Sequence, residues 1–389
     1  MSQTEELLNI PLAYNPANSQ TSASHLVYSL FPEWTPQKGG RGVKFIRFTD
    51  GITNTLLKCV HKPPPGLSPQ EAKAFEDENS VLLRAYGNDT SILIDRDREC
   101  TSHLLLSKHG LAPPLLARFA NGLLYRFVAG RVCSVEDLAD REVWTAVAER
   151  LGEWHGILPT HPAGQTSGSE VNDLWGVMSR WIDALPSHND ETKAQKSELR
   201  RELENLQCAK KNGGYGLKGQ DGGVGLVTGH CDLLNGNVIK LPGDGKKVHF
   251  IDYEYSTPCE RAFDIANHFA EWGGFACDYE KLPTRGVRRD FIRAYLRSFH
   301  EHRKDGVQVT EEEIEGLMQE VDLYRGVPGF YWGIWALIQA TISQIDFDYA
   351  QYALVRLGEF HAWRDSSDTP RERRWASEEI ATIDVTVQN

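Results

Sequence analysis

The chain has 389 residues, of which 40% are hydrophobic and 25% are charged, a mixture typical of folded globular domains. The 54 acidic residues outnumber the 42 lysines and arginines, and the formal net charge of −12 disfavours nucleic acids and anionic membranes as partners. The seven cysteines form no CxxC pair, and their wide spacing indicates neither a disulfide framework nor a zinc site.

Residues 1–15 lack the basic stretch and long apolar stretch that a signal or transit peptide requires. No apolar run approaches the roughly 18 residues that a membrane-spanning helix needs. We therefore expect a cytoplasmic protein with no stable membrane insertion. Residues 1–40 mix short strand-like pieces with Pro, Ser and Gly, and we interpret them as an N-terminal extension.

The pattern of residues 41–128 predicts a small β-rich domain. Asp50-Gly51 is a strong turn signal between two strand-like segments, and Asn121-Gly122 is a hairpin signal. In chain order we predict strands at 43–48 and 53–60, a loop with some helix at 61–78, a strand at 81–86, a helix at 96–109 and two strands around Asn121-Gly122. The small lobe of a kinase-like fold has this order of elements.

The rest of the chain is mainly helical in pattern, so we expect a large helical domain over residues 129–365 and a polar tail over 366–389. The segment 212–225 contains seven glycines but lacks the GxxxxGK[ST] order of a phosphate-binding loop, which favours a surface connection. Helices are predicted at 135–158, 174–185 and 190–211.

The strongest functional signal is the pattern H-x-D-x-x-x-x-N, formed by His230, Asp232 and Asn237 and followed by an apolar strand. Asp252 emerges from a second apolar strand, fifteen residues after Asn237. Phosphoryl transfer needs a carboxylate to orient the nucleophile and accept its proton, together with oxygen ligands for magnesium. The pattern therefore predicts a phosphoryl-transfer site. The alternative interpretation is that Asp232 caps a turn and Asp252 forms a structural salt bridge.

Residues 262–272 have the spacing of a helix, with positions 264, 268 and 271 on one stripe. Asp264 is expected to cap this helix or to anchor the preceding catalytic loop. Glu271 is placed to reach a cationic substrate. Without other signals, a glutamate at such a helix position is more often a solvated charge.

Three segments resemble the choline/ethanolamine kinase family: HCDLLNGNVI, FIDYEYSTPCERAFDIANHFAEW and YWGIWALIQATISQIDFDYAQYA. GITNTLL, VLLRAYGND and IDRDREC resemble its small-lobe motifs, so the resemblance spans roughly residues 40–365. It implies an α+β, two-lobe, protein-kinase-like fold of the aminoglycoside phosphotransferase/choline kinase type. The N-lobe is then small and β-rich and binds ATP, and the C-lobe is large and helical.

The resemblance also implies roles for individual residues in the catalytic segments. His230 and Asp232 belong to the catalytic motif, with Asp232 as the base. Asn237 and Asp252 are expected to bind Mg²⁺, and Glu254 to assist at the metal. The sequence departs from the family's common pattern at Cys231, where Asn is frequent, and at residues 256–261 near the substrate site.

In the small lobe, the resemblance implies contacts to ATP. The segment from Asp50 to Asn54 is expected to cover the phosphates, because glycine lets backbone approach them closely. Arg84 stands where the family places its phosphate-contacting cation, with Glu99 as its ion-pair partner. The expected nucleotide-binding residues are Gly51, Ile52, Thr53, Asn54, Arg84, Glu99 and, at the adenine-side hinge, Tyr125, Arg126 and Phe127.

Trp332 and Trp335 are three apart on an apolar helix, so both can face one side. Spacing alone favours core packing, but the resemblance places them where the family holds an ammonium group, which aromatic faces attract. The expected substrate-binding residues are Asp232, Tyr255, Glu271, Trp332, Trp335 and Tyr352.

Residues 345–349 and Leu233-Leu234 look more like the ethanolamine branch of the family than the choline branch. The leading hypothesis is ATP-dependent phosphorylation of ethanolamine, the first step of the phosphatidylethanolamine branch of phospholipid synthesis. A choline kinase, a dual-specificity enzyme, an aminoglycoside phosphotransferase and an inactive kinase-like binding module are the alternatives. The expected partner is a small amino alcohol and not nucleic acid; a homodimer is left open.

Overall fold

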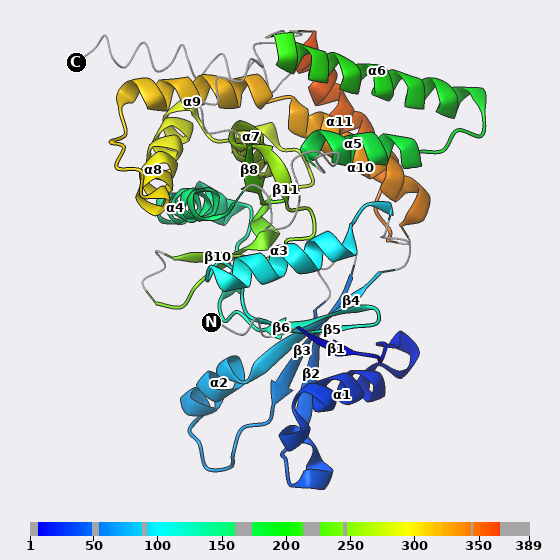
Figure 1. The fold of residues 1–389 in the computed structure, drawn as a ribbon, viewed down its shortest axis with the longest axis vertical. Coiled ribbons are helices and arrows are strands. Elements are labelled where there is room, and N and C mark those ends of the chain that lie inside the picture. Colours follow the sequence, from blue (N-terminus) through cyan, green and yellow to red (C-terminus); the bar gives the residue numbers. More distant parts are fainter. Residues whose placement is uncertain are drawn as a thin grey trace. The chain divides into compact units, whose positions relative to one another are not determined.

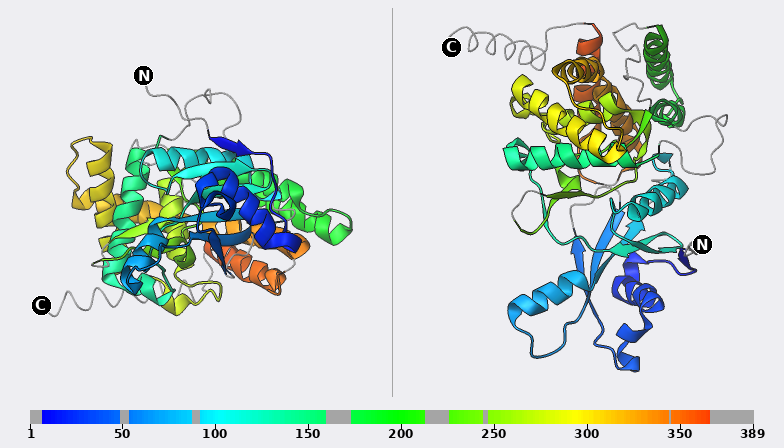
Figure 2. Two further views of the ribbon diagram at one scale, coloured as in Figure 1. Left: turned by 90° about the horizontal axis from the view of Figure 1, so that it is seen from below. Right: turned by 60° about the vertical axis from the view of Figure 1, so that its left-hand side comes forward.

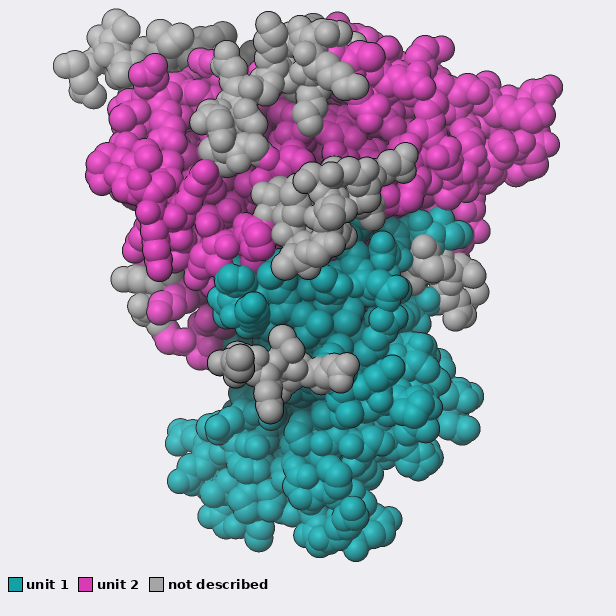
Figure 3. Space-filling model, viewed as in Figure 1, with its two compact units in different colours: residues 1–130 teal, residues 131–389 magenta. Residues whose placement is uncertain are grey.

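The structure is a computed structural model that describes residues 7–48, 54–87, 92–159, 173–212, 226–243, 247–343 and 345–365 (Figure 1). The chain divides into two compact units, residues 1–130 and 131–389, which Figure 3 shows in different colours. No helix within the described ranges is long and apolar enough to cross a membrane. All seven cysteines are free thiols.

The first unit is built on a six-stranded sheet with the order β1-β5-β6-β4-β3-β2. All neighbouring strands are antiparallel except β1 and β5, which pair in parallel. The β2–β3 and β5–β6 hairpins have the positions that the turn signals predict. The strands are β1 (Leu8–Ile10), β2 (Val43–Phe48), β3 (Asn54–His61), β4 (Ser80–Tyr86), β5 (Leu115–Phe119) and β6 (Gly122–Arg126).

Three helices belong to this unit: α1 (Ser19–Leu30), α2 (Pro69–Glu78) and α3 (Arg96–Lys108). Ala23, Leu26 and Val27 form the buried stripe of α1 and join the core beneath the sheet. A capping box between Ser68 and Glu71 starts α2 inside the segment predicted to be mostly loop. The N-terminal residues from Leu8 onward thus contribute both a strand and a core helix to the unit.

The second unit is mainly helical. Helices α4 and α8 lie side by side, as do α10 and α11 (Figure 2). Helix α7 makes less extensive contacts with α9 and α10. The helices are α4 (Arg141–Ile157), α5 (Leu174–Ala184), α6 (Asp190–Asn212), α7 (Arg261–Glu271), α8 (Arg285–Arg303), α9 (Glu311–Tyr324), α10 (Val327–Ile342) and α11 (Tyr349–Arg364).

Two small antiparallel sheets complete the second unit, with the orders β10-β9-β7 and β11-β8. Along the chain, β9 and β10 of the first sheet stand between β8 and β11 of the second, so two loops connect these strands across the sheets. The strands are β7 (Arg131–Val132), β8 (Leu226–Gly229), β9 (Val238–Lys240), β10 (Val248–Phe250) and β11 (Thr257–Glu260).

Candidate active site

The two small sheets bring together the segments that carry the predicted catalytic residues. The end of β8 pairs with the start of β11, where Gly229 faces Thr257, and β9 pairs with β10. The backbone N–H of Ile251 donates to the carbonyl oxygen of Asn237 over 3.0 Å. The loop that follows β8 and the loop that follows β10 are therefore held side by side, although they are separated along the chain.

Asn237 closes the loop that begins at Asp232. Its side-chain amide donates to the backbone oxygen of Asp232 over 2.7 Å and to Oδ2 of the same residue over 2.9 Å. A short 3-10 helix, Asn235–Asn237, provides the turn that makes this return possible. Because the amide nitrogen is used in this way, the amide oxygen is the Asn237 atom suited to binding a cation.

Three other carboxylates lie close enough to Asp232 for their charges to act on it, and we call Asp232, Asp252, Glu254 and Glu271 the acidic cluster. Burial raises the pKa of Asp232 well above its usual range. The negative charges of the other three raise it further, while the hydrogen bond from Asn237 opposes the rise. Such mutual repulsion between buried carboxylates is relieved by a cation.

The backbone is strained on both sides of this cluster. Cys231 and Asp252 have φ angles of 62° and 65°, in the left-handed region that residues with a Cβ rarely adopt. Strain of this kind persists only where surrounding contacts enforce it, and it is concentrated at functional sites.

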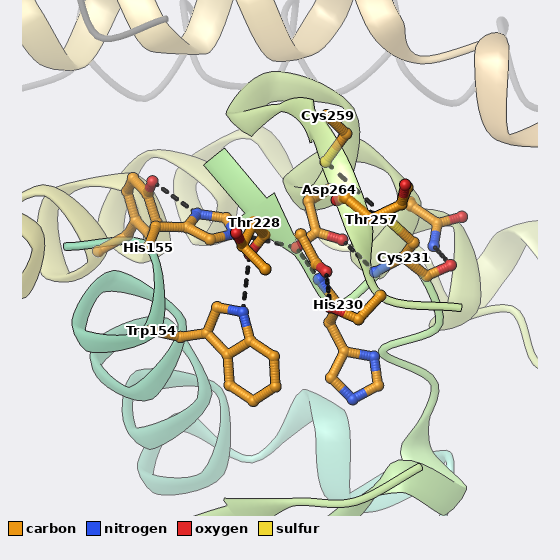
Figure 4. A network of polar contacts seen from close by, with 12 residues as sticks. Trp154, His155, Thr228, His230, Cys231, Thr257, Cys259 and Asp264 are labelled. Atoms are coloured by element: carbon orange, nitrogen blue, oxygen red, sulfur yellow. Dashed lines mark hydrogen bonds and ion pairs between the residues drawn. The ribbon is translucent and has the colours of Figure 1, made fainter. Parts of the chain in front are cut away.

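Asp264 provides those contacts on the Cys231 side (Figure 4). Its carboxylate accepts the backbone N–H of His230 at 2.9 Å and that of Cys231 at 2.7 Å. His155 Nε2 lies 3.0 Å from the same carboxylate, and His155 Nδ1 lies 2.9 Å from the Tyr295 hydroxyl. Asp264 makes no capping hydrogen bond to α7, so of the two structural roles considered for it, the structure has the loop anchor.

Burial favours a neutral carboxyl at Asp264, yet its pKa is lowered. The hydrogen bond and charge of His155 and the backbone N–H of His230 outweigh burial. The anchor is consequently ionised at neutral pH, which strengthens each hydrogen bond that it accepts.

His230 is fully buried and lies within the loop framework. Its Nε2 is 3.0 Å from the backbone oxygen of Ile251, and its Nδ1 accepts the backbone N–H of Asp232 at 3.3 Å. Burial lowers the pKa of this imidazole to about 4. A neutral ring with both nitrogens engaged is suited to holding the two catalytic segments together.

The catalytic loop is tied to a group of aromatic rings through Asn267, which the sequence analysis did not single out. Its amide donates to the Cys231 backbone oxygen at 3.1 Å, and its amide oxygen accepts the Trp332 indole N–H at 2.8 Å. The Trp335 indole N–H donates to the Tyr255 hydroxyl at 2.8 Å. Asn267 lies three residues after Asp264 on α7, so both side chains lie on one face of the helix. This spacing is the sequence signal that could have identified Asn267.

Trp332 and Trp335 belong to a series of neighbouring aromatic rings whose centroids lie 4.8–5.8 Å apart. All the side chains in this series are buried except Phe347, which is 38% exposed. Such edge-to-face packing provides faces that attract a cation. We call this set the aromatic cluster: Tyr255, Trp332, Trp335, Phe347, Tyr349 and Tyr352.

In the first unit, the expected ion pair between Arg84 and Glu99 is present at 3.7 Å, and both side chains are buried. Arg96 also pairs with Glu99 at 3.0 Å and lies over the ring of Tyr86 at 4.0 Å, so a second arginine adjoins the expected phosphate contact. Asn54 is the first residue of β3. Gly51, Ile52 and Thr53 lie outside the described residues.

Tyr125 and Arg126 end β6, and Phe127 follows directly. The ring of Phe127 lies 3.6 Å from the ammonium of Lys58, which forms an ion pair with Asp77 at 3.0 Å. Lys58 is a buried basic residue beside the predicted hinge, and its place in the sequence gives no signal of this, because its partners come from α2 and from the residue after β6.

The fold is similar to those of solved structures in the choline/ethanolamine kinase family. The structure of Plasmodium vivax ethanolamine kinase superposes with a TM-score of 0.68 at 24% identity, covering 93% of this chain and 91% of that one. The structure of Cryptosporidium parvum choline kinase gives 0.66 at 19% identity, covering 88% and 95%. These likenesses show that the fold is of the choline kinase type.

A family model described as choline/ethanolamine kinase matches residues 45–361. Human ethanolamine kinase 1 is 34% identical over 341 residues, which cover 87% of this chain and 70% of the human protein. Ethanolamine kinase of Drosophila melanogaster is 33% identical, covering 81% and 68%. The chain belongs to the choline/ethanolamine kinase family, as its sequence motifs predict.

Proposed function

We propose that this protein is an ethanolamine kinase, which transfers the terminal phosphoryl group of ATP to the hydroxyl of ethanolamine. The observation that carries the proposal is the convergence of Asp232, Asn237 and the Asp252 segment in one buried acidic cluster, in a chain similar to ethanolamine kinases. Phosphoethanolamine made in this way enters phospholipid synthesis.

Asp232 has the position of the general base. Its carboxylate accepts a hydrogen bond from Asn237, and its backbone is held by His230. In the ionised form it orients the substrate hydroxyl and accepts its proton as the phosphoryl group is transferred. Most of the catalytic effect comes from fixing the reacting groups in place, for which the network around Asp264 supplies the rigidity.

The acidic cluster fits Mg²⁺. Its donors are carboxylate oxygens and the amide oxygen of Asn237, which are the ligands that Mg²⁺ prefers. The repulsion between Asp232 and its neighbours would be offset by a divalent cation. We assign Asn237 and Asp252 as its ligands, with Glu254 assisting; when bound, the metal neutralises negative charge on the phosphates.

The aromatic cluster is assigned to the substrate's ammonium group. Tyr255 connects the acidic cluster to the aromatic cluster, because it follows Glu254 directly in the sequence and its hydroxyl accepts a hydrogen bond from the Trp335 indole. A primary ammonium also has three N–H groups, which can donate hydrogen bonds to a carboxylate such as Glu271. The quaternary ammonium of choline has no N–H group. This difference favours ethanolamine over choline, in agreement with the relatives.

Nucleotide contacts are assigned to the first unit. Arg84, held by Glu99, is the candidate cation for the phosphates, and Arg96 is a second one. Tyr125, Arg126 and Phe127 are assigned to the adenine side.

Phosphorus NMR of a reaction containing enzyme, Mg-ATP and ethanolamine tests the proposal. We expect the signals of ADP and phosphoethanolamine to grow in equal amounts. The product should disappear when Mg²⁺ is chelated, and in the variant Asp252→Ala. ATP hydrolysis without phosphoethanolamine would refute the assignment, and turnover by Asp252→Ala with unchanged magnesium dependence would refute the ligand role.

A further inference from the structure

A buried ion pair links Glu271 of the acidic cluster to Arg356 on α11. The Arg356 guanidinium Nη2 donates to Glu271 Oε1 at 2.9 Å, and the two side chains are only 1% and 7% exposed. The guanidinium also lies 5.7 Å from the ring centroid of Tyr352, one turn earlier on α11. Glu271 is the last residue of α7, so the pair joins the helix that anchors the catalytic loop to the helix that carries Tyr352.

Glu271 acts on both clusters. Its charge contributes to the raised pKa of Asp232 in the acidic cluster and to that of the Tyr352 hydroxyl in the aromatic cluster, although burial is the larger cause in each case. Glu271 therefore acts both on the residue proposed to activate the hydroxyl and on a residue proposed to bind the ammonium group.

Stability does not explain this pair. A buried ion pair is often no more stable than apolar residues of similar volume, because both charges must leave water. Arg356 Nε in addition makes no hydrogen bond with any residue that the structure describes, and a buried donor of this kind lowers stability. The pair therefore calls for a functional reason.

The contacts of Glu271 suggest that reason. Glu271 is buried, and Arg356 faces it from the side of α11. The hydrogen bond from the guanidinium fixes one carboxylate oxygen of Glu271. Without Arg356, the carboxylate would lose the contact that fixes its orientation and would accept hydrogen bonds from an ammonium group less well.

We propose that Arg356 is a positioning residue for the substrate amine, which acts by holding the Glu271 carboxylate in a fixed orientation beside the aromatic cluster. This inference rests on the proposed function, because it takes the ligand of the cluster to be a primary ammonium. Arg356 itself is not placed in contact with the reacting atoms.

The test is a double-mutant cycle at saturating Mg-ATP with Arg356→Met, Glu271→Gln and the double variant. We expect Arg356→Met to raise the KM for ethanolamine by about 10- to 100-fold, with a much smaller change in kcat. The double variant should be no worse in KM than Glu271→Gln alone, because Arg356 acts through Glu271. Arg356→Lys should recover part of the affinity.

A matched control is Arg364→Met. Arg364 lies two turns further along α11 and pairs with Glu202 at 2.7 Å, so this variant removes an ion pair from the same helix away from the aromatic cluster. Its KM should stay within about twofold of the wild-type value, as expected for a distant, independent site.

An unchanged KM in Arg356→Met, or effects of the two single variants that multiply in the double variant, would overturn the inference. If Arg356→Met does not fold, Arg356→Gln decides: a raised KM at unchanged melting temperature supports the role, and an unchanged KM refutes it. Wild-type protein that makes no phosphoethanolamine would instead refute the proposed function.

Discussion

Asp232 is the residue on which the chemistry depends most directly. Replacing it by alanine removes the proposed base, so we expect kcat for ethanolamine to fall by about 10²–10⁴-fold. ADP release measures the change, and circular dichroism verifies the fold. Asp290→Ala, which removes a carboxylate paired with Arg293 on α8, is the control and should retain turnover. A correctly folded Asp232→Ala enzyme with near-normal kcat would contradict the role of Asp232.

Asp264 has a distinct role, which its pH dependence reveals. Its folded-state pKa lies below the usual 3.8, so the carboxylate stabilises the fold fully above that pH, and the stabilisation is lost as the pH falls through the lower folded-state value. At neutral pH we expect Asp264→Asn to lower the unfolding free energy by about 3–5 kcal/mol.

Denaturant titrations of the wild type and Asp264→Asn at neutral and acidic pH provide the measurement. The difference in unfolding free energy between the two proteins should shrink on acidification. A difference that stays constant with pH would show that the charge of Asp264 is not what holds the loop.

The sequence identifies side chains near the reacting groups better than those that support them. His230, Asp232 and Asn237 are identifiable because a single loop must present them at fixed spacing. Asn267 and Arg356 are not, since their roles depend on contacts between helices that lie far apart in the chain.

At the scale of elements, α10 and α11 hold the aromatic cluster through a close approach at Gly329. A Cβ there would lie 2.5 Å from the backbone oxygen of Arg356, so the helices would have to separate. We expect Gly329→Ala to destabilise the protein by about 1–3 kcal/mol, the usual cost of overpacking.

Gly358→Ala is the matched control, because it lies on α11 and its added Cβ would meet nothing within 4 Å. It should stabilise the protein by up to about 1 kcal/mol, because alanine favours helix more than glycine does. Thermal melts of both variants decide the matter; equal melting temperatures would mean that the helices do not depend on Gly329.

Local pattern predicts most of the elements, and the exceptions have physical causes. The helix expected from residue 135 begins instead at Arg141, because Asp140 caps it and Glu136–Ala139 forms a 3-10 turn. Strand β1 was not predicted as a separate element: it has three residues, and its parallel pairing with β5 is a long-range contact. The Gly-rich segment from 213 to 225 lies outside the described residues.

At the scale of the whole molecule, the first unit carries the residues proposed to bind the nucleotide, and the second unit carries the acidic and aromatic clusters. The net charge of −12 is consistent with a cationic small substrate, but the acidic cluster is the specific feature. The similar ethanolamine kinases and the proposed substrate site both favour ethanolamine over choline.

The most direct test is the kcat/KM of the purified protein with Mg-ATP for ethanolamine, choline and kanamycin, measured side by side by ADP release. We predict a clear preference for ethanolamine, weaker turnover of choline and none of kanamycin. A higher kcat/KM for choline, or no ADP release with either amino alcohol, would contradict the account.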